Sequence, residues 1–132
     1  MDLGLNTLVS GLNAQSRAVD VAAQNTVNVN STGVLEGDGQ QAYIPQDVDF
    51  ISQNPGGVRT EVKPRDPAFV PAYAPDDLSA NADGYVAAPD INLAEEQMNL
   101  IRAETAYKAT ASLIPVVKDM YEELINAVDK NA

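Results

Sequence analysis

The chain has 132 residues, of which 45% are hydrophobic and only 5% aromatic, so its interior must be built mainly from Ala, Val, Leu and Ile. This length suffices for one modest domain but not for two independent cores. The formal net charge of -11 argues against nucleic acids and anionic membrane surfaces as partners, because both are negatively charged and would repel the chain.

Cysteine and histidine are both absent from the sequence. Their absence removes disulfides, thiolate and imidazole catalysis, and most zinc sites. Nucleophiles such as Ser10 and Ser112 therefore have no imidazole to activate them. Two pairs of adjacent carboxylates, Glu95–Glu96 and Glu122–Glu123, are expected on solvated helix faces. We expect a protein that is not an enzyme and that uses no cofactor or metal.

The N-terminal residues do not have the pattern of a cleaved signal peptide, since Asp2 stands where basic residues are required and polar residues interrupt the apolar ones. No apolar run approaches the roughly 20 residues that cross a bilayer. We therefore expect no direct insertion into a membrane.

A helical pattern extends from Leu3 to about Val29. Steps of three and four residues form the seam of a heptad repeat: Leu5, Leu8, Leu12, Gln15, Val19, Ala22 and Thr26. The opposite face carries small uncharged side chains: Asn6, Ser10, Asn13, Ser16 and Gln24. A solvent-exposed face is normally charged, so we expect an assembly to cover this helix on most sides. An Ala-rich bundle helix with a small polar outer face is the alternative.

An asparagine-rich run follows this helix, with Asn25, Asn28 and Asn30 preceding Ser31-Thr32-Gly33. Asn tolerates the left-handed backbone conformation and Gly adopts it freely, so the run predicts a helix C-cap and an exit turn.

The middle of the chain is acidic and rich in turn residues. Residues 36–90 hold ten acidic residues against Arg59, Lys63 and Arg65. Three short segments alternate like strands, 42–44, 48–51 and 57–62, and the turn Asn54-Pro55-Gly56-Gly57 predicts a hairpin between the last two. From Lys63 to Pro75, closely spaced prolines predict an extended chain without regular structure.

A second and stronger helix is predicted from residue 92 to the end. Asn92 can cap it, and Glu95 stands three residues on, as in a capping box. Glu104 and Lys108 form an expected ion pair on its surface. Its seam is Leu93, Gln97, Leu100, Glu104, Tyr107, Ala111, Ile114, Lys118, Tyr121, Ile125 and Val128. Pro115 should kink the helix without ending it, because the pattern resumes in register beyond it.

These segments predict a mainly α fold with a small β or irregular middle. Residues 1–33 and 92–132 form an antiparallel, coiled-coil-like helix pair, and residues 34–91 supply a β-hairpin and an extended Pro-rich segment. Narrow seams lined by Ala give little burial to one chain, so we expect the ends to order fully only on assembly. The expected packing residues are Leu5, Leu8, Leu12, Val19, Ala22, Asn25, Asn28, Leu93, Leu100, Tyr107, Ala111, Ile114, Tyr121 and Val128.

One fragment partly imitates a calcium-binding loop. In residues 79–90, Asn81 and Asp83 occupy ligand positions, but Ser79 stands where Asp is preferred and Asp90 is shorter than the usual Glu. An Asx turn is the simpler interpretation. A small secreted acidic binding module that holds calcium through this loop remains the alternative function.

Both ends of the sequence resemble the flagellar rod and hook protein family. The N-terminal signature covers residues 10–17 (SGLNAQSR), 19–25 (VDVAAQN) and 28–33 (NVNSTG). Before the second helix, residues 80–86 (ANADGYV) and 89–93 (PDINL) resemble segments of the same family. Within that helix the positions that agree are Glu96, Met98, Ala103, Tyr107 and Ala109. Pro115, and Gln24 in place of Ser or Asn, depart from the family pattern.

The resemblance implies a structural subunit of the flagellar basal-body rod, and the short acidic middle is most similar to the proximal-rod members of the family. Such a subunit is exported by the flagellar type III apparatus without a cleaved signal and polymerises helically across the periplasm to transmit torque. The implied partners are copies of itself, other proximal-rod proteins, the distal rod, and the junction with the MS ring and export gate.

Overall fold

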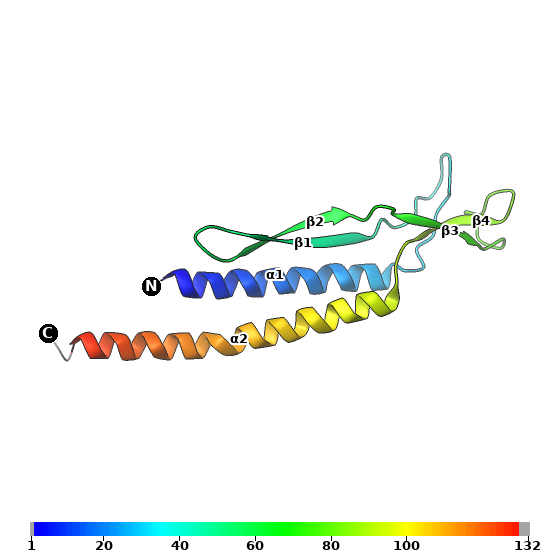
Figure 1. The fold of residues 1–132 in the computed structure, drawn as a ribbon. Coiled ribbons are helices and arrows are strands. Elements are labelled where there is room, and N and C mark those ends of the chain that lie inside the picture. The colour runs from blue at the N-terminus through cyan, green and yellow to red at the C-terminus, as the bar shows by residue number, and fades with distance from the viewer. Residues whose placement is uncertain (1, 130–132) are drawn as a thin grey trace.

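The computed structural model describes residues 2–129, with side chains described from residue 4 onward. Within them lie two helices, α1 (Asp2–Val27) and α2 (Leu93–Asp129), and four strands: β1 (Gln46–Ser52), β2 (Val58–Pro64), β3 (Phe69–Tyr73) and β4 (Tyr85–Pro89). The helices lie side by side and antiparallel (Figure 1). The predicted mainly α fold with a small β middle is therefore confirmed. Neither helix has an apolar stretch long enough to cross a membrane.

Helix α1 lies between α2 and the hairpin of β1 and β2, and it contacts both (Figure 1). The hairpin reaches the N-terminal turns of α1, where the Val58 N–H donates a hydrogen bond of 3.1 Å to Ser10 Oγ. A Cβ added to Gly56 would lie 3.1 Å from Oγ1 of Thr7. Part of the uncharged face of α1 is thus covered by the chain's own hairpin, whereas its coverage by an assembly stays a prediction.

The hairpin between β1 and β2 was predicted from its turn, and it is confirmed. The strands pair antiparallel from Gln46 opposite Pro64 to Ser52 opposite Val58. The turn closes through Gly57, whose φ of 100° suits glycine. The strand predicted at residues 42–44 is wrong, because this segment passes against the exit of α1 and forms no ladder there.

A second hairpin, β3 with β4, replaces part of the irregular segment predicted between Lys63 and Pro75. The ladder pairs Pro71 with Ala87, and Pro89 with Phe69. Ala87 bonds through both backbone groups to Gly33, at 2.9 and 3.0 Å, so its pairing with Pro71 is a non-hydrogen-bonded one. Pro89 lies two residues further along β4, so its pairing with Phe69 is also a non-hydrogen-bonded one. The prolines therefore break no ladder bond, and the prediction from their number alone was wrong.

The end of α1 differs from the predicted left-handed exit. Among the described residues other than glycine, none has a positive φ, and Gly33 has none either. Gly33 is required for close approach instead, because a Cβ there would lie 2.1 Å from the backbone nitrogen of Ala42. Asn25 is turned into the interior, where it bonds to the hairpin.

The start of α2 is capped as predicted. Asn92 Oδ1 accepts the N–H of Ala94 at 3.0 Å. No bond from the Asn92 N–H back to Glu95 is present in the described part of the chain, so the reciprocal half of a capping box is not formed. The ion pair between Glu104 and Lys108 is confirmed. The helix continues through Pro115, as predicted, and bends in its middle (Figure 1).

Candidate assembly interface

The contact between the helices is lined on α1 by small residues seven apart: Gly4, Gly11 and Ala18. A Cβ added to Gly11 would lie 3.7 Å from Cγ2 of Thr110. One added to Gly4 would lie 3.1 Å from the hydroxyl of Tyr121. Small side chains allow the two helix axes to approach closely. The contact line thus runs one position to the side of the leucines that carry the hydrophobic period.

Of the predicted packing residues of the N-terminal helix, Asn25 lies on this contact line and the others lie beside it. Ala22 and Asn25 are buried, at 3% and 1% exposure. The other five are half-buried: Leu5, Leu8, Leu12, Val19 and Asn28. One chain therefore leaves part of this leucine line uncovered.

The predicted packing residues of α2 divide into two groups. Four are half-buried: Leu100, Ala111, Ile114 and Tyr121. Three are exposed, with Leu93 at 43%, Tyr107 at 42% and Val128 at 60%. The deepest apolar residue of this helix is Ala103, at 4%, which the predicted seam did not include. Packing of the exposed residues against another subunit stays a prediction.

Asn25 forms the centre of a buried polar network at the inner end of the helix pair. Its Nδ2 donates to the Gln46 carbonyl at 2.8 Å and to Oε1 of Glu96 at 3.1 Å. Its Oδ1 accepts the Gln46 N–H at 3.0 Å and the Tyr43 hydroxyl at 3.1 Å. One side chain thus joins α1 to β1 and to α2. Full pairing is what makes such a buried amide tolerable.

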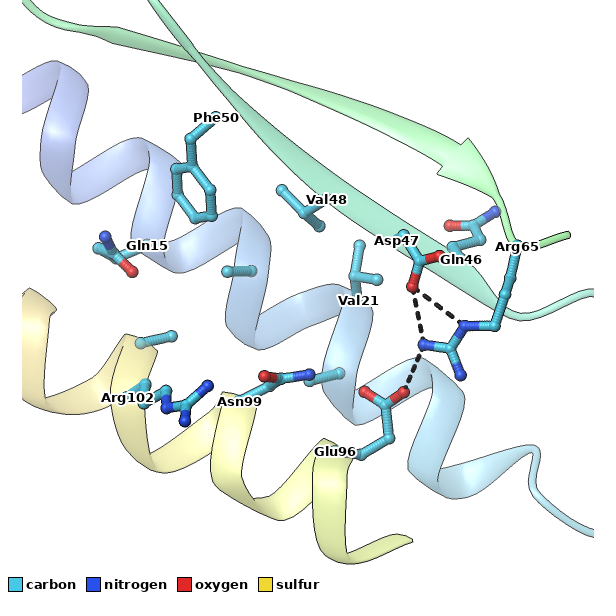
Figure 2. A pocket seen from close by; sticks show the side chains of 13 residues that line it. Gln15, Val21, Gln46, Asp47, Val48, Phe50, Arg65, Glu96, Asn99 and Arg102 are labelled. Carbon is cyan, nitrogen blue, oxygen red and sulfur yellow. Dashed lines mark hydrogen bonds and ion pairs between the residues drawn. The ribbon is translucent and has the colours of Figure 1, made fainter. Parts of the chain in front are cut away.

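Arg65, just beyond β2, extends this network (Figure 2). Its Nη2 bonds to Oε1 of Glu96 at 2.9 Å and to Oδ1 of Asp47 at 2.7 Å. Its Nη1 donates to the carbonyl of Asp90 at 2.8 Å. The expectation that Glu96 is solvated is therefore wrong, because this carboxylate is 2% exposed and paired with a guanidinium.

The surroundings of Arg65 and Tyr43 favour a charged guanidinium and a neutral hydroxyl. Hydrogen bonding to Asp47 raises the pKa of the Arg65 guanidinium above its ordinary value despite desolvation, and Glu96 adds to this. Burial raises the pKa of the Tyr43 hydroxyl, and the nearby Glu96 carboxylate raises it further. The tyrosine is thus held neutral as a donor, and the arginine is held charged.

A groove of about 330 Å³ lies beside the network, between α1, α2 and β1 (Figure 2). Val48 and Phe50 line it from the hairpin, and Asn99 and Arg102 line it from α2. Its lining contains no serine, cysteine, histidine or lysine. The groove suits the packing of side chains and offers no set of groups for nucleophilic catalysis.

The outer surface of α2 is unusually apolar for a helix facing solvent. The large exposed apolar residues on the side turned away from α1 are Met98, Ile101, Leu113, Val116, Met120 and Leu124. All are at least 49% exposed. Exposed apolar residues that recur on one side of a helix indicate a surface for protein association.

The loop with partial likeness to a calcium site is used for turns. Asn81 Oδ1 accepts the N–H groups of Asp83 and Tyr85, at 3.0 and 2.9 Å. The Asx turn is therefore confirmed. In the described residues no group of three or more acidic side chains is placed to hold a metal ion, so nothing here supports the calcium-binding alternative.

Sequence reasoning missed the roles of Arg65 and Tyr43 and placed Glu96 in solvent. Glu96 stands seven residues before Ala103 and fourteen before Thr110, which gives the contact line of α2. That period was a usable signal, but it is weak because only one of these residues is apolar. Nothing in the local sequence distinguishes Arg65 from an exposed arginine.

Comparison with known proteins indicates the class of protein to which this chain belongs. The family described as flagellar basal body rod FlgEFG protein C-terminal matches residues 82–127. This segment holds β4 and nearly all of α2. The match covers the C-terminal part of the helix pair and indicates the class of flagellar rod proteins.

Relatives of the whole chain narrow the class. The flagellar basal-body rod protein FlgC of Escherichia coli is 34% identical, over 84% of this chain and 85% of the relative. FlgC of Salmonella typhimurium is 33% identical over the same shares, and FlgC of Borreliella burgdorferi is 26% identical over 92% and 93%. The chain belongs to the FlgC family, as a structural subunit of the flagellar basal-body rod.

Proposed function

We propose that this subunit forms part of the proximal rod and polymerises helically, with copies of itself and other rod proteins, to transmit torque across the periplasm. Its neighbours are the other proximal-rod proteins, the distal rod, and the junction with the MS ring and export gate. Export occurs without a cleaved signal peptide, and the subunit catalyses no reaction. The names of the relatives support a place in the basal-body rod, and the short middle, residues 34–91, supports the proximal part of it.

The observation that carries the assembly proposal is an uncovered continuation of the helix seam. Tyr121 reaches Gly4 near the start of α1, and α2 then runs on to Asp129 (Figure 1). Ile125 and Val128 follow Tyr121 at steps of four and three, so they lie on the same face. They are 48% and 60% exposed. This face is continuous with the intrachain contact and fits a helix of a neighbouring copy.

Deleting the gene tests the function directly. We expect non-motile cells whose purified basal bodies lack a complete rod by electron microscopy, with both defects restored by the gene on a plasmid. Motile deletion cells with complete rods would end the proposal.

A pair of variants tests the surface. Ile125→Ser with Val128→Ser should leave the circular dichroism of the purified chain nearly unchanged but should not restore swimming to the deletion strain. Glu123→Ser with Asn126→Ser changes the opposite face of the same turns and serves as the matched control, which should restore swimming. Equal complementation by both pairs would remove this surface from the proposed interface.

A further inference from the structure

The contact between α1 and α2 is nearly periodic, so the packing of the side chains along it does not by itself determine the register. In steps of seven, α1 presents Gly4, Gly11, Ala18 and Asn25. In the same steps, α2 presents Glu96, Ala103, Thr110 and Val117. The observed register sets Gly11 against Thr110, and Asn25 against Glu96.

A slip of one heptad would replace these contacts by others of similar size. It would set Gly11 against Ala103 in one direction, or against Val117 in the other. Glycine accepts any of these neighbours, so packing alone discriminates weakly between the registers. The slip would move one helix along the other by about 10 Å.

The pair at the inner end is different, because it satisfies buried polar groups in one register only. Glu96 is 2% exposed. A slip in one direction would set its carboxylate against Ala18, and a slip in the other would set it beyond the end of α1, so neither would bring it to the Asn25 amide. Leaving a buried polar group unpaired is strongly unfavourable. A single buried polar contact is known to fix the register of coiled coils in this way. We infer that the Asn25–Glu96 hydrogen bond selects the register of the helix pair.

The network also transmits this choice to the β middle. Asn25 holds β1 through Gln46, and Glu96 holds the end of β2 through Arg65. The hairpin therefore docks in full only when the two helices are in register. This inference concerns one chain and does not depend on how copies assemble, so it can fail while the proposed rod function stands.

The absence of cysteine permits a direct test of register with engineered pairs. Gly11→Cys with Thr110→Cys reports the native register, because a Cβ at Gly11 lies 3.7 Å from Thr110 Cγ2. Gly11→Cys with Ala103→Cys, or with Val117→Cys, reports a slip by one heptad in either direction. The dilute full chain is oxidised mildly, and the intramolecular disulfide is measured by its mobility on a non-reducing gel.

In the parent sequence only the native pair should close efficiently. Glu96→Leu removes the bond between the helices but keeps those of Asn25 to Gln46, and it should raise the slipped disulfides about tenfold. Glu96→Gln still accepts from Asn25 and should restore the native pattern. Asn99→Leu, one turn away on α2, is the matched control and should leave the pattern unchanged.

Three results would overturn the inference. One is equal closure of native and slipped pairs in the parent sequence. Another is the absence of slipped product in Glu96→Leu with helix content retained by circular dichroism. The third is loss of helix content in Glu96→Leu without slipped product, since that result would assign Glu96 to stability and not to register.

Discussion

Arg65 and Glu96 meet at 2.9 Å across 31 residues of sequence, and this contact ties the end of β2 to the first turn of α2. The arginine side chain is 17% exposed and the glutamate side chain 2%. The carboxylate is therefore shielded from water and is compensated by the guanidinium of Arg65.

Replacing Arg65 by alanine should destabilise the chain by about 3 kcal/mol, because it leaves the buried Glu96 carboxylate without its cation. Urea unfolding followed by circular dichroism at 222 nm measures the change. Lys108→Ala breaks the exposed pair with Glu104 and is the matched control, with a loss below about 1 kcal/mol. Similar losses in both variants would show that burial adds nothing to the Arg65 contact.

Alkaline pH should weaken the network through Tyr43. Its pKa in the folded chain is raised above the ordinary value of 10.0, so the neutral form is favoured by folding. The stability from this group is fully present below pH 10 and is lost as the pH rises through the folded pKa. In an absorbance titration of tyrosinate at 295 nm, Tyr43→Phe should remove a late-titrating component. An unchanged upper end of the titration would contradict this.

Two glycine substitutions should have opposite signs. Gly33→Ala should destabilise the fold by about 2 kcal/mol, because its Cβ would overlap the backbone of residues 40–42. Gly11→Ala should stabilise it by about 1 kcal/mol, because alanine favours the helix and meets Thr110 at an ordinary contact distance. Thermal melting of both variants beside the parent measures the difference. Gly11→Ala that melts below the parent would show a tighter helix contact than described.

Fraying should be confined to one end of the helix pair in dilute solution. Amide hydrogen exchange should be slow near Ala103, where both helices and the hairpin meet, and fast in residues 122–129, where α2 runs past α1. Circular dichroism should show less helix than the 26 and 37 residues of α1 and α2. Full protection of residues 122–129 in the monomer would contradict the need for a neighbouring copy.

The helical ends were predictable because their apolar periods are long and one is capped by Asn92. The predicted contact line of α1 lies one position away from the observed one, because the hydrophobic period follows the leucines at 5, 8 and 12. Gly4 and Gly11 contribute almost no hydrophobic signal, yet they decide where two helix backbones approach. Periodicity thus identified the helices well but located their mutual contact less accurately.

In the middle of the chain, strands could be predicted from the sequence only where a recognisable turn connects them. The hairpin after Ser52 follows from Asn54-Pro55-Gly56-Gly57, whereas β3 was hidden by Pro71. A proline disrupts a ladder only if its nitrogen faces the partner strand. Successive residues of a strand face the partner alternately, and the pairing with the partner strand decides which of them do so. The Arg65 contact has the same origin, because it joins segments that only the complete fold brings together.

Pro71 of the second hairpin also limits which other strands can pair with this sheet. At a non-hydrogen-bonded position the nitrogen of Pro71 points outward, to the free edge of β3, where it offers no donor to an incoming strand. Copies held at high local density, as in a rod, would otherwise be prone to join by strand addition. With strand addition disfavoured at that edge, the assembly that we propose would be formed by the apolar helix faces and not by the sheet.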